Sequence, residues 1–347
     1  MPNYEVSVFG RTPAAATAPT LTELDPITTW TSLRWQRELN APDTYTISAP
    51  VADLPASIRT PLTHLHTTPL ELQFTRDGEV VGRGPVVDLE IDAGVITINA
   101  RGLLYYLDYM IVESAFSRAN TDQATIIKDL IDYYQALSYG NYGLVTSGLT
   151  TVGVLRSMTV DEGEFPTIGE KVAQWLDNLN GMDLWVDPAT RQVLSAYPTR
   201  GTDLSATVVL DARVIRDDVY GVSVAAGMLA SEGFATADAV TGTYADTTLR
   251  STFGRSGVAA SSSSITESAT VAALAQMAQE IRATPLTTLG VGQFVAVTGV
   301  DVGDFAEGDT VGFVYDAGLG TVDTTVRLRT FAVSVEDTRE LLEVGFV

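Results

Sequence analysis

The chain has 347 residues and a formal net charge of −22, from 43 acidic and 21 basic side chains. It contains no Cys, which excludes disulfides, thiol nucleophiles and Cys-ligated zinc. A charge of −22 repels phosphates and argues against a nucleic-acid-binding surface. Only two basic residues are Lys, Lys128 and Lys171, which leaves little scope for Schiff-base chemistry or a phosphate-binding Lys.

The balance of residue types indicates a folded globular protein. Hydrophobic residues make up 45% and charged residues 18%, which is too apolar for a disordered chain. No apolar run approaches the roughly 20 residues that span a bilayer, so we expect no membrane insertion. The first residues lack a basic region followed by an apolar stretch, and we therefore expect synthesis and folding in a cytoplasm.

The first hundred residues predict antiparallel β-structure. Alternating apolar residues mark strands at 4–8, 70–74, 80–81, 86–91 and 96–98, with turns at 76–78 and 92–94. The stretch Arg11–Asp25 is rich in Ala, Thr and Pro and predicts a loop. Gly82, Gly84 and Pro85 interrupt one strand and predict a bulge or corner.

The middle of the chain predicts two helices and a hairpin. Apolar residues recur at helical spacing over 121–137. A second helix begins at Thr167, where Glu170 completes a capping box, and ends near Gly181. Residues 184–196 then predict a hairpin around the turn at 187–190.

The last third returns to β-structure. Strands are expected at 208–210, 219–224, 294–297, 310–315, 326–335 and 341–347. Residues 226–264 are rich in Gly, Ala, Ser and Thr and predict a long exposed loop. A third helix is expected over about 267–283, capped by Ser264 with Glu267 and followed by Pro285.

These elements predict a β-rich α+β fold. Its expected parts are a first β domain (1–110), an α/β insert (111–204) and a second β-rich domain (205–347) that carries the long loop and the third helix.

The two His residues form the first candidate for a metal site. His64 and His66 would lie on one face of a strand, but a catalytic zinc site needs three protein ligands and the nearest carboxylates, Asp53 and Glu71, are not clustered with them. A polar loop or strand is therefore favoured. Gly290-Val291-Gly292 lacks the third glycine of a dinucleotide-binding motif and predicts a turn.

An acidic loop forms the second candidate. Its members are Asp301, Asp304, Glu307 and Asp309, whose spacing does not match an EF-hand. The favoured interpretation is a solvated turn, and a Ca²⁺ site stays open as the alternative.

Aromatic residues could line a sugar site, but each has a structural explanation. Trp175 lies on the apolar face of the second helix, and Tyr105, Tyr106 and Tyr109 are expected to pack between the first β domain and the insert. The sequence therefore assigns no catalytic, cofactor-binding or metal-binding residue, and predicts no enzyme and no cofactor.

The order of several short motifs resembles that of phage minor tail proteins. Residues 30–47 resemble their opening W-x-x-x-R-x-L-x-x-P-G-x-F-x-L, with Asp43 in place of Gly and Tyr45 as the aromatic residue. Gly82–Val86 resembles the family's G-x-I strand, and Ile98–Leu107 its L-x-x-x-G-x-D-L-x-x-L-L step. At the end, 307–312 and 326–333 resemble P-G-D-x-V and x-R-I-x-x-I-x-V.

The family in question is that of siphophage tail-hub proteins. The resemblance implies two β-barrel-like domains flanking the insert and a homotrimer whose ring adapts a six-fold tail tube to a three-fold tip. It further implies a virion tail-tip location after synthesis in the bacterial host, and passage of DNA through the ring without sequence-specific binding. The implied partners are a distal tail or tail tube protein, a tape measure protein and tip or fibre proteins.

Two other functions stay open at this stage. A tail-associated cell-wall hydrolase is the main alternative, although no motif marks a catalytic domain. A receptor-binding module would more often show a terminal sandwich domain or a fibre repeat.

Overall fold

The computed structural model describes most of the chain. The described residues are 2–64, 69–176, 181–211, 222–225, 229–237, 240–261, 268–280, 283, 286–289, 292–295, 302–316, 321–336 and 339–346. The chain divides into two compact units. Unit 1 comprises Met1–Asp177, Gly181–Asp217 and Gly292–Val347, and unit 2 comprises Asn178–Asn180 and Asp218–Val291.

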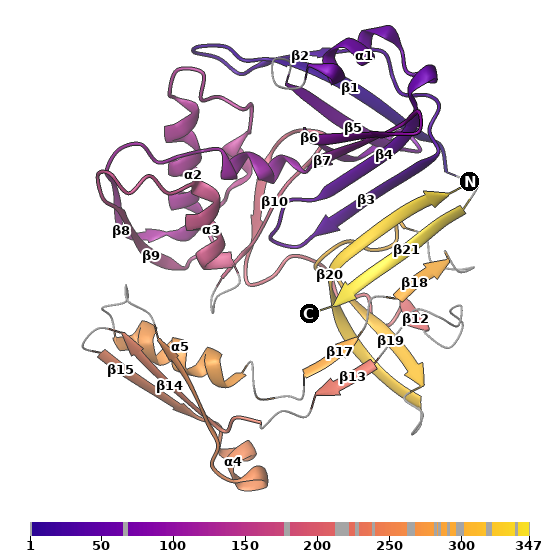
Figure 1. Cartoon of the computed structure of the whole chain (residues 1–347). Helices are drawn as coiled ribbons and strands as arrows, with labels where there is room; N and C mark the ends of the chain where they lie inside the picture. Colours follow the sequence, from indigo (N-terminus) through magenta and orange to yellow (C-terminus); the bar gives the residue numbers. More distant parts are fainter. Residues whose placement is uncertain are drawn as a thin grey trace. The chain divides into compact units, whose positions relative to one another are not determined.

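Unit 1 is built on one twelve-stranded sheet (Figure 1). Its N-terminal strands are β1 (Tyr4–Thr12), β2 (Thr20–Glu23), β3 (Ser32–Glu38), β4 (Thr44–Pro50), β5 (Leu70–Arg76), β6 (Glu79–Asp92) and β7 (Val95–Arg101). Its C-terminal strands are β12 (Val209–Asp211), β18 (Gly292–Val295), β19 (Thr310–Asp316), β20 (Thr321–Glu336) and β21 (Arg339–Phe346). The strand order is β12-β19-β20-β3-β4-β7-β6-β5-β1-β2, with β21 and β18 branching from β20.

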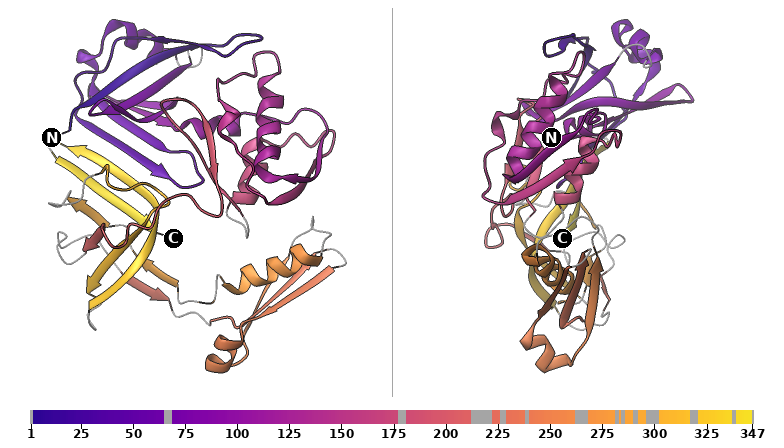
Figure 2. Two further views of the ribbon diagram at one scale, coloured as in Figure 1. Left: turned by 180° about the vertical axis from the view of Figure 1, so that it is seen from behind. Right: turned by 90° about the vertical axis from the view of Figure 1, so that its left-hand side faces the viewer.

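The pairing of β20 with β3 joins the two ends of the chain in this sheet. It runs antiparallel from Thr330 opposite Glu38 to Glu336 opposite Ser32, and the left view of Figure 2 shows the N-terminal (indigo) strands next to the C-terminal (yellow) ones. Trp35 of β3 packs edge-to-face on Phe331 of β20, with ring centroids 5.3 Å apart. The described sheets are open and none closes into a barrel, so the two barrel-like domains are not confirmed while the β-rich fold is.

The prediction of a loop over residues 11–25 is wrong in part. β1 continues to Thr12, and β2 pairs with it from Phe9 opposite Glu23 to Thr12 opposite Thr20. β2 is an edge strand with an almost fully exposed surface, so it lacks the apolar alternation on which the sequence prediction rests.

The bulge predicted at Gly82 and Gly84 is confirmed in β6. The β5–β6 register shifts at Phe74 and Thr75, and the β6–β7 register shifts between Val86 and Asp88. A Cβ at Gly84 would lie 1.7 Å from the carbonyl oxygen of Arg101, so only glycine allows this approach of the two backbones. Between β4 and β5 lie η1 (Val51–Asp53) and the unpredicted helix α1 (Ala56–Thr63).

The segment 111–204 shares a core with η2 (Leu103–Asp108), which lies before the predicted boundary of the insert. Its own elements are β8 (Phe116–Asp122), α2 (Gln123–Gln135), η3 (Thr146–Gly148), β9 (Leu155–Val160), α3 (Ile168–Leu176), β10 (Asp183–Val186) and β11 (Val193–Ala196). Ile127, Ile131 and Val172 are among the fully buried residues that pack the helices together. Both helices and the hairpin were predicted, whereas the strand pair β8–β9 was not.

Helix caps explain where these helices begin. Asp122 caps α2, because its Oδ1 accepts a hydrogen bond of 3.0 Å from the Ala124 N–H. The capping box at α3 is confirmed: Thr167 N–H donates to Glu170 Oε2 at 2.9 Å, and Glu170 N–H donates to Thr167 Oγ1 at 3.1 Å. Among the described residues no helix is long and apolar enough to cross a membrane.

Unit 2 corrects the prediction of a long loop over 226–264. It contains β13 (Val222–Ala225), β14 (Glu232–Ala237), β15 (Val240–Ala245), α4 (Thr247–Phe253), β16 (Gly257–Ser261), α5 (Ser268–Glu280) and β17 (Leu286–Leu289). Strands β15-β14-β16 form a sheet on which α5 packs. The small residues that resemble a loop composition are what allow this packing: a Cβ at Gly233 would lie 1.8 Å from the carbonyl oxygen of Ala275.

The third predicted helix is confirmed as α5, and the strand expected at 219–224 corresponds to β13. The strands expected at 294–297, 310–315, 326–335 and 341–347 correspond to β18 to β21. The capping pair Ser264 and Glu267, the end of the second helix before Gly181, and Pro285 involve residues outside the described part of the chain.

We predict that Gly233→Ala destabilises unit 2 because the added methyl group would overlap the α5 backbone. Overpacking of this kind costs about 1–3 kcal/mol. Urea unfolding followed by circular dichroism measures the loss. The matched control is Ala259→Ser, which adds one atom to an exposed position of the same sheet and should change stability by less than about 0.5 kcal/mol. Equal stability of the two variants would contradict the prediction.

Candidate functional site

A charged junction ties three segments of unit 1 together. Asp183, at the start of β10, is 4% exposed and accepts hydrogen bonds from the Arg327 guanidinium of β20 and from the backbone N–H of Arg200. Its Oδ1 accepts a further bond of 3.2 Å from Asn40 Nδ2, at the tip of the β3–β4 hairpin. One carboxylate therefore links the insert, the N-terminal strands and the C-terminal strands.

Glu307 forms the second centre of this junction. It is 4% exposed, and its Oε1 accepts a hydrogen bond from Arg200 Nη1. Its Oε2 lies 4.0 Å from Arg37 Nη1 and has no hydrogen-bond partner among the described residues. The Arg200 guanidinium also lies over the Trp185 ring, 4.3 Å from its centroid, and this stacking fixes the orientation of the charge.

Asp43 adds a titratable group close to Glu307. Its carboxylate accepts hydrogen bonds from the Glu38 N–H at 3.2 Å and from the Tyr45 hydroxyl at 2.9 Å. Burial and, after it, the negative charge of Glu307 raise the pKa of Asp43 to about 6, against the opposing effects of Arg37 and Tyr45. Asp43 is thus a group of this junction whose charge changes near neutral pH.

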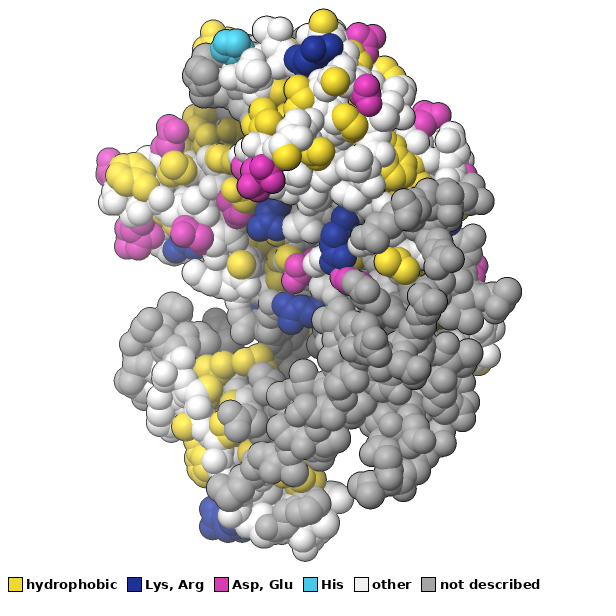
Figure 3. All heavy atoms as spheres, turned by 45° about the vertical axis from the view of Figure 1, so that its right-hand side comes forward, with side chains coloured by type: hydrophobic (Ala, Val, Ile, Leu, Met, Phe, Trp, Pro, Cys, Tyr) yellow, Lys and Arg dark blue, Asp and Glu magenta, His cyan; other side chains and the backbone are white. Residues whose placement is uncertain are grey.

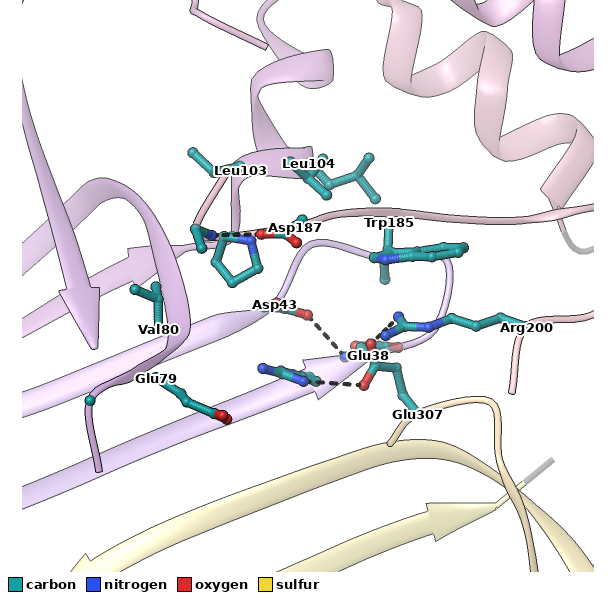
Figure 4. A pocket seen from close by; sticks show the side chains of 17 residues that line it. Glu38, Asp43, Glu79, Val80, Leu103, Leu104, Trp185, Asp187, Arg200 and Glu307 are labelled. Carbon is teal, nitrogen blue, oxygen red and sulfur yellow. Dashed lines mark hydrogen bonds and ion pairs between the residues drawn. The ribbon is translucent and has the colours of Figure 1, made fainter. Parts of the chain in front are cut away.

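Four charged residues of the junction, Arg37, Asp43, Arg200 and Glu307, border a pocket of about 480 Å³ (Figure 4). The β3–β4 hairpin, the β5–β6 turn, the start of η2 and the segment after β10 all contribute to its walls. Five carboxylates and two guanidinium groups line it, the latter from Arg37 and Arg200. Among the described residues no three carboxylate or imidazole groups converge as metal ligands. The hydrogen bonds of Asp183 tie three segments of unit 1 together.

A second network is centred on Glu71 of β5, which is fully buried. Arg191 donates two hydrogen bonds to its carboxylate, at 2.7 and 3.2 Å, and Arg83 Nε donates one at 3.1 Å. The Tyr106 hydroxyl of η2 donates the fourth, at 2.6 Å. Burial alone would raise the pKa of Glu71, but Arg191, Tyr106 and Arg83 outweigh it and lower that pKa, so the carboxylate stays charged.

Backbone strain accompanies the second network at Arg191. This residue lies in the β10–β11 turn with φ of 60°, in the left-handed region. Its side chain also donates to the carbonyl oxygens of Gly143 at 3.1 Å and Tyr142 at 2.6 Å. Such a conformation costs about 1–3 kcal/mol and persists where surrounding contacts outweigh it. Arg191 thus fastens the insert to β5.

The acidic loop is not the solvated turn that the sequence predicts. Glu307 and Asp309 are buried, and Asp309 accepts hydrogen bonds from the N–H groups of Thr202 and Ala306, both at 2.7 Å. Asp304 is exposed and Asp301 lies outside the described residues. Tertiary contacts bury this loop, and they act over more than a hundred residues of sequence separation.

The other sequence candidates have different outcomes. His64 ends α1 rather than lying in a strand, and its Nδ1 lies 2.9 Å from the Thr60 carbonyl oxygen, while His66 lies outside the described residues. The Gly290 motif also falls partly on undescribed residues. Tyr106 packs as expected between the first β strands and the insert, whereas Tyr109 is 45% exposed. Trp175 is half-buried against the insert core.

Sequence reasoning missed the central residues Glu71, Asp183 and Arg191. Glu71 lies between Leu70 and Leu72 in an alternating strand, where the pattern assigns it to solvent. The sequence nevertheless held a signal, because a single carboxylate between two leucines of a strand could be buried, and a buried carboxylate needs a cation beside it. The insert, which covers this face, supplies that cation from a residue 120 positions away.

With the fold and the junction described, the chain can be compared with known proteins. No family model matches it, and no curated protein matches it. Solved structures, in contrast, do match this chain. The 43 kDa tail protein of prophage MuSo2 from Shewanella oneidensis matches with a TM-score of 0.63 and 14% identity, over 99% of this chain and 98% of that one.

Two further tail-protein structures give the same result. The tail protein from Neisseria meningitidis matches with a TM-score of 0.60 and 15% identity, over 99% of this chain and 96% of that one. Prophage tail protein gp18 from Listeria monocytogenes matches with a TM-score of 0.58 and 13% identity, over 98% of this chain and 94% of that one. The chain has the fold of prophage tail proteins. The resemblance found from the order of its motifs is therefore confirmed at the level of the fold.

Removing the central carboxylate should strongly destabilise unit 1. Glu71→Gln leaves Arg83 and Arg191 buried without their counter-charge, and breaking a buried pair costs about 3–5 kcal/mol. Chemical denaturation measures the loss. Glu90→Gln makes the same change at an exposed position of the next strand and should be nearly neutral. A loss below about 1 kcal/mol for Glu71→Gln would contradict the assigned role.

Asp43 should make stability depend on pH in a defined direction. Its folded pKa of about 6 exceeds the ordinary value of 3.8, so its contribution is greatest below pH 4 and is lost as the pH rises through 6. Asn cannot ionise. The free energy of unfolding of Asp43→Asn relative to the unaltered chain should therefore rise between pH 4 and pH 7. Each pH unit that separates the folded pKa of Asp43 from its ordinary value contributes about 1.4 kcal/mol to this rise.

Urea unfolding at the two pH values tests this expectation. The substitution also changes the hydrogen bonds of residue 43 with the Glu38 N–H and the Tyr45 hydroxyl. This effect is the same at both pH values, so it cancels when the two measurements are compared. Asp92→Asn, at an exposed position, serves as the control. A difference that stays constant or falls with pH would refute the assigned environment of Asp43.

Proposed function

We propose that the chain is a structural protein of a phage tail, acting as the hub of the tail tip. The observation that carries this proposal is the match along nearly the whole chain to prophage tail proteins, each of which is covered over at least 94% of its own length. The hub is a homotrimer in this proposal. Its ring adapts the six-fold tail tube to a three-fold tip and lines the channel through which DNA leaves.

The open sheet of unit 1 supports an assembly role. Within the described residues the strand order ends at β2 on one side and β12 on the other. Edge strands present backbone N–H and C=O groups that pair readily with a neighbouring chain. Ring formation requires such surfaces, because each subunit must contact the next through complementary faces until the rotation closes.

The charge of the chain suits a DNA conduit. A trimer would carry −66, three times the −22 of one chain, and acidic walls keep passing phosphates from adhering. On the face drawn in Figure 3 acidic side chains lie scattered among hydrophobic ones instead of forming one field. We propose that the ring directs acidic side chains into its channel. A map of the assembled ring with a basic lumen would refute this part.

The remaining parts of the proposal follow from the hub role. The neighbours of the ring are a distal tail or tail tube protein, the tape measure protein and tip or fibre proteins. The chain is made in the cytoplasm of the bacterial host and resides in the virion tail tip, without membrane insertion, sequence-specific nucleic-acid binding or catalysis.

Electron microscopy of purified tails, together with native mass spectrometry of the chain, tests the proposal. We expect three copies per tail in a ring at the distal end of the tube. An incubation with purified cell walls is the companion assay, because the competing function is a tail-associated hydrolase. A chain that is absent from tails, or that releases soluble fragments from cell walls, would overturn the structural role.

A further inference from the structure

Phe165 combines exposure with a strained backbone. Its side chain is 58% exposed, and its φ of 49° lies in the left-handed region. This region is unfavourable for a bulky residue, and the following Pro166 further restricts the residue before it to extended conformations. Tyr139 is also exposed with a positive φ, but it lies in the turn after α2 and donates its N–H to Ala15. Because Phe165 is 58% exposed, its packing against the described residues does not explain the strain.

The backbone on both sides of Phe165 is fixed. Before it, Asp161–Glu164 forms a turn, closed by a 3.2 Å hydrogen bond from the Glu164 N–H to the Asp161 carbonyl, with Gly163 at φ of 90°. After it, the Pro166 carbonyl accepts a 3.0 Å bond from Val112, and the capping box of α3 holds Thr167. Strain persists where flanking contacts over-determine it, and here they hold an aromatic side chain out in solvent.

Two further exposed apolar side chains belong to the segment that pairs with the chain just after Phe165. Ile111 pairs with Thr167 in an antiparallel bridge, two residues along the chain from Phe165, and Tyr109 lies two residues before Ile111. Tyr109 is 45% exposed and Ile111 40%. We name these three residues, Tyr109, Ile111 and Phe165, the aromatic knob.

Acidic residues surround the knob. Asp161, Glu162 and Glu164 precede Phe165, and Glu113 lies opposite it across the bridge, all of them exposed. Lys171 lies 3.8 Å from Glu164, and the Arg101 guanidinium lies over the ring of Tyr105, which packs edge-to-face on Tyr109. These acidic residues attract a surface that carries Arg or Lys and repel an anionic lipid surface. It also disfavours a second copy of this chain, whose net charge is −22.

We propose that the aromatic knob docks into an apolar pocket, rimmed by Arg or Lys, on a different protein subunit of the tail. This inference rests on the proposed tail function. Aromatic residues with low conformational freedom dominate binding at the centre of interfaces, and surrounding charges select the partner. The strained backbone presents Phe165 in its bound position, which reduces the entropy lost on docking.

The test uses phage tails assembled in cells that lack the chain and are supplied with a variant. Phe165→Gly removes the side chain and permits a positive φ, so the purified variant should unfold at the same temperature as the unaltered chain or higher. Its incorporation into tails should fall at least about tenfold, as expected for loss of a central anchor. Glu162→Lys should also lower incorporation.

Leu155→Ala is the matched control. Leu155 is 56% exposed in β9, in ordinary strand geometry, and its truncation should leave incorporation unchanged. A photo-crosslinking aromatic residue in place of Phe165, in an otherwise unaltered chain, should link in assembled tails to a different protein, at an apolar position near Arg or Lys. Normal incorporation of Phe165→Gly, or crosslinking to lipid or to a second copy of this chain, overturns the knob alone. Absence of the unaltered chain from tails overturns the hub role as well.

Discussion

The buried carboxylate of Glu71 sets the geometry of unit 1. A charge with no access to water must be met by cations and hydrogen-bond donors, or its desolvation would outweigh the packing around it. Arg83 comes from the neighbouring strand, Tyr106 from η2 and Arg191 from the turn of the β10–β11 hairpin. Because charge-assisted hydrogen bonds are directional, this convergence allows one placement of the insert against the sheet. Local hydrogen bonds, from the Arg191 N–H to the Asp187 carbonyl and from the Asp187 N–H to the Gln192 carbonyl, close the turn that holds Arg191 at its positive φ.

The same kind of constraint joins the C-terminal strands to this arrangement. Asp183 and Glu307 bind guanidinium groups from Arg327 and Arg200, and the β3–β20 pairing continues the sheet across the two ends of the chain. Apolar packing fills unit 1, while the buried ion pairs determine which segments meet. Strain has a different basis at Phe165, where flanking contacts hold the backbone while the side chain is 58% exposed, in the position that we propose for docking to a partner subunit.

Local patterns predicted the parts of the fold that depend on neighbouring residues. The alternation of Tyr4, Val6 and Val8, the helical spacing over 121–137 and the capping box at Thr167 all act within a few residues, and each is present in the structure. The sequence prediction was wrong over 226–264, where a composition rich in small residues fits both a loop and a helix packed closely on a sheet. Gly233 and Gly242 belong to a run that is typical of loops, yet their missing side chains let α5 approach the sheet.

The sequence by itself determined the β-rich class, the insert helices and hairpin, the absence of thiol chemistry and, through the order of its motifs, the resemblance to tail proteins. Tertiary structure decided which polar residues are buried. Glu71 and Glu307 look like solvent-facing acids in sequence, because alternation and turn composition describe only nearby residues. Their true surroundings come from cations 120 and 107 positions away, brought close by sheet pairing and by docking of the insert. A charge distant in sequence leaves no periodic mark on the residues that it will contact, so only the folded chain could show these ties.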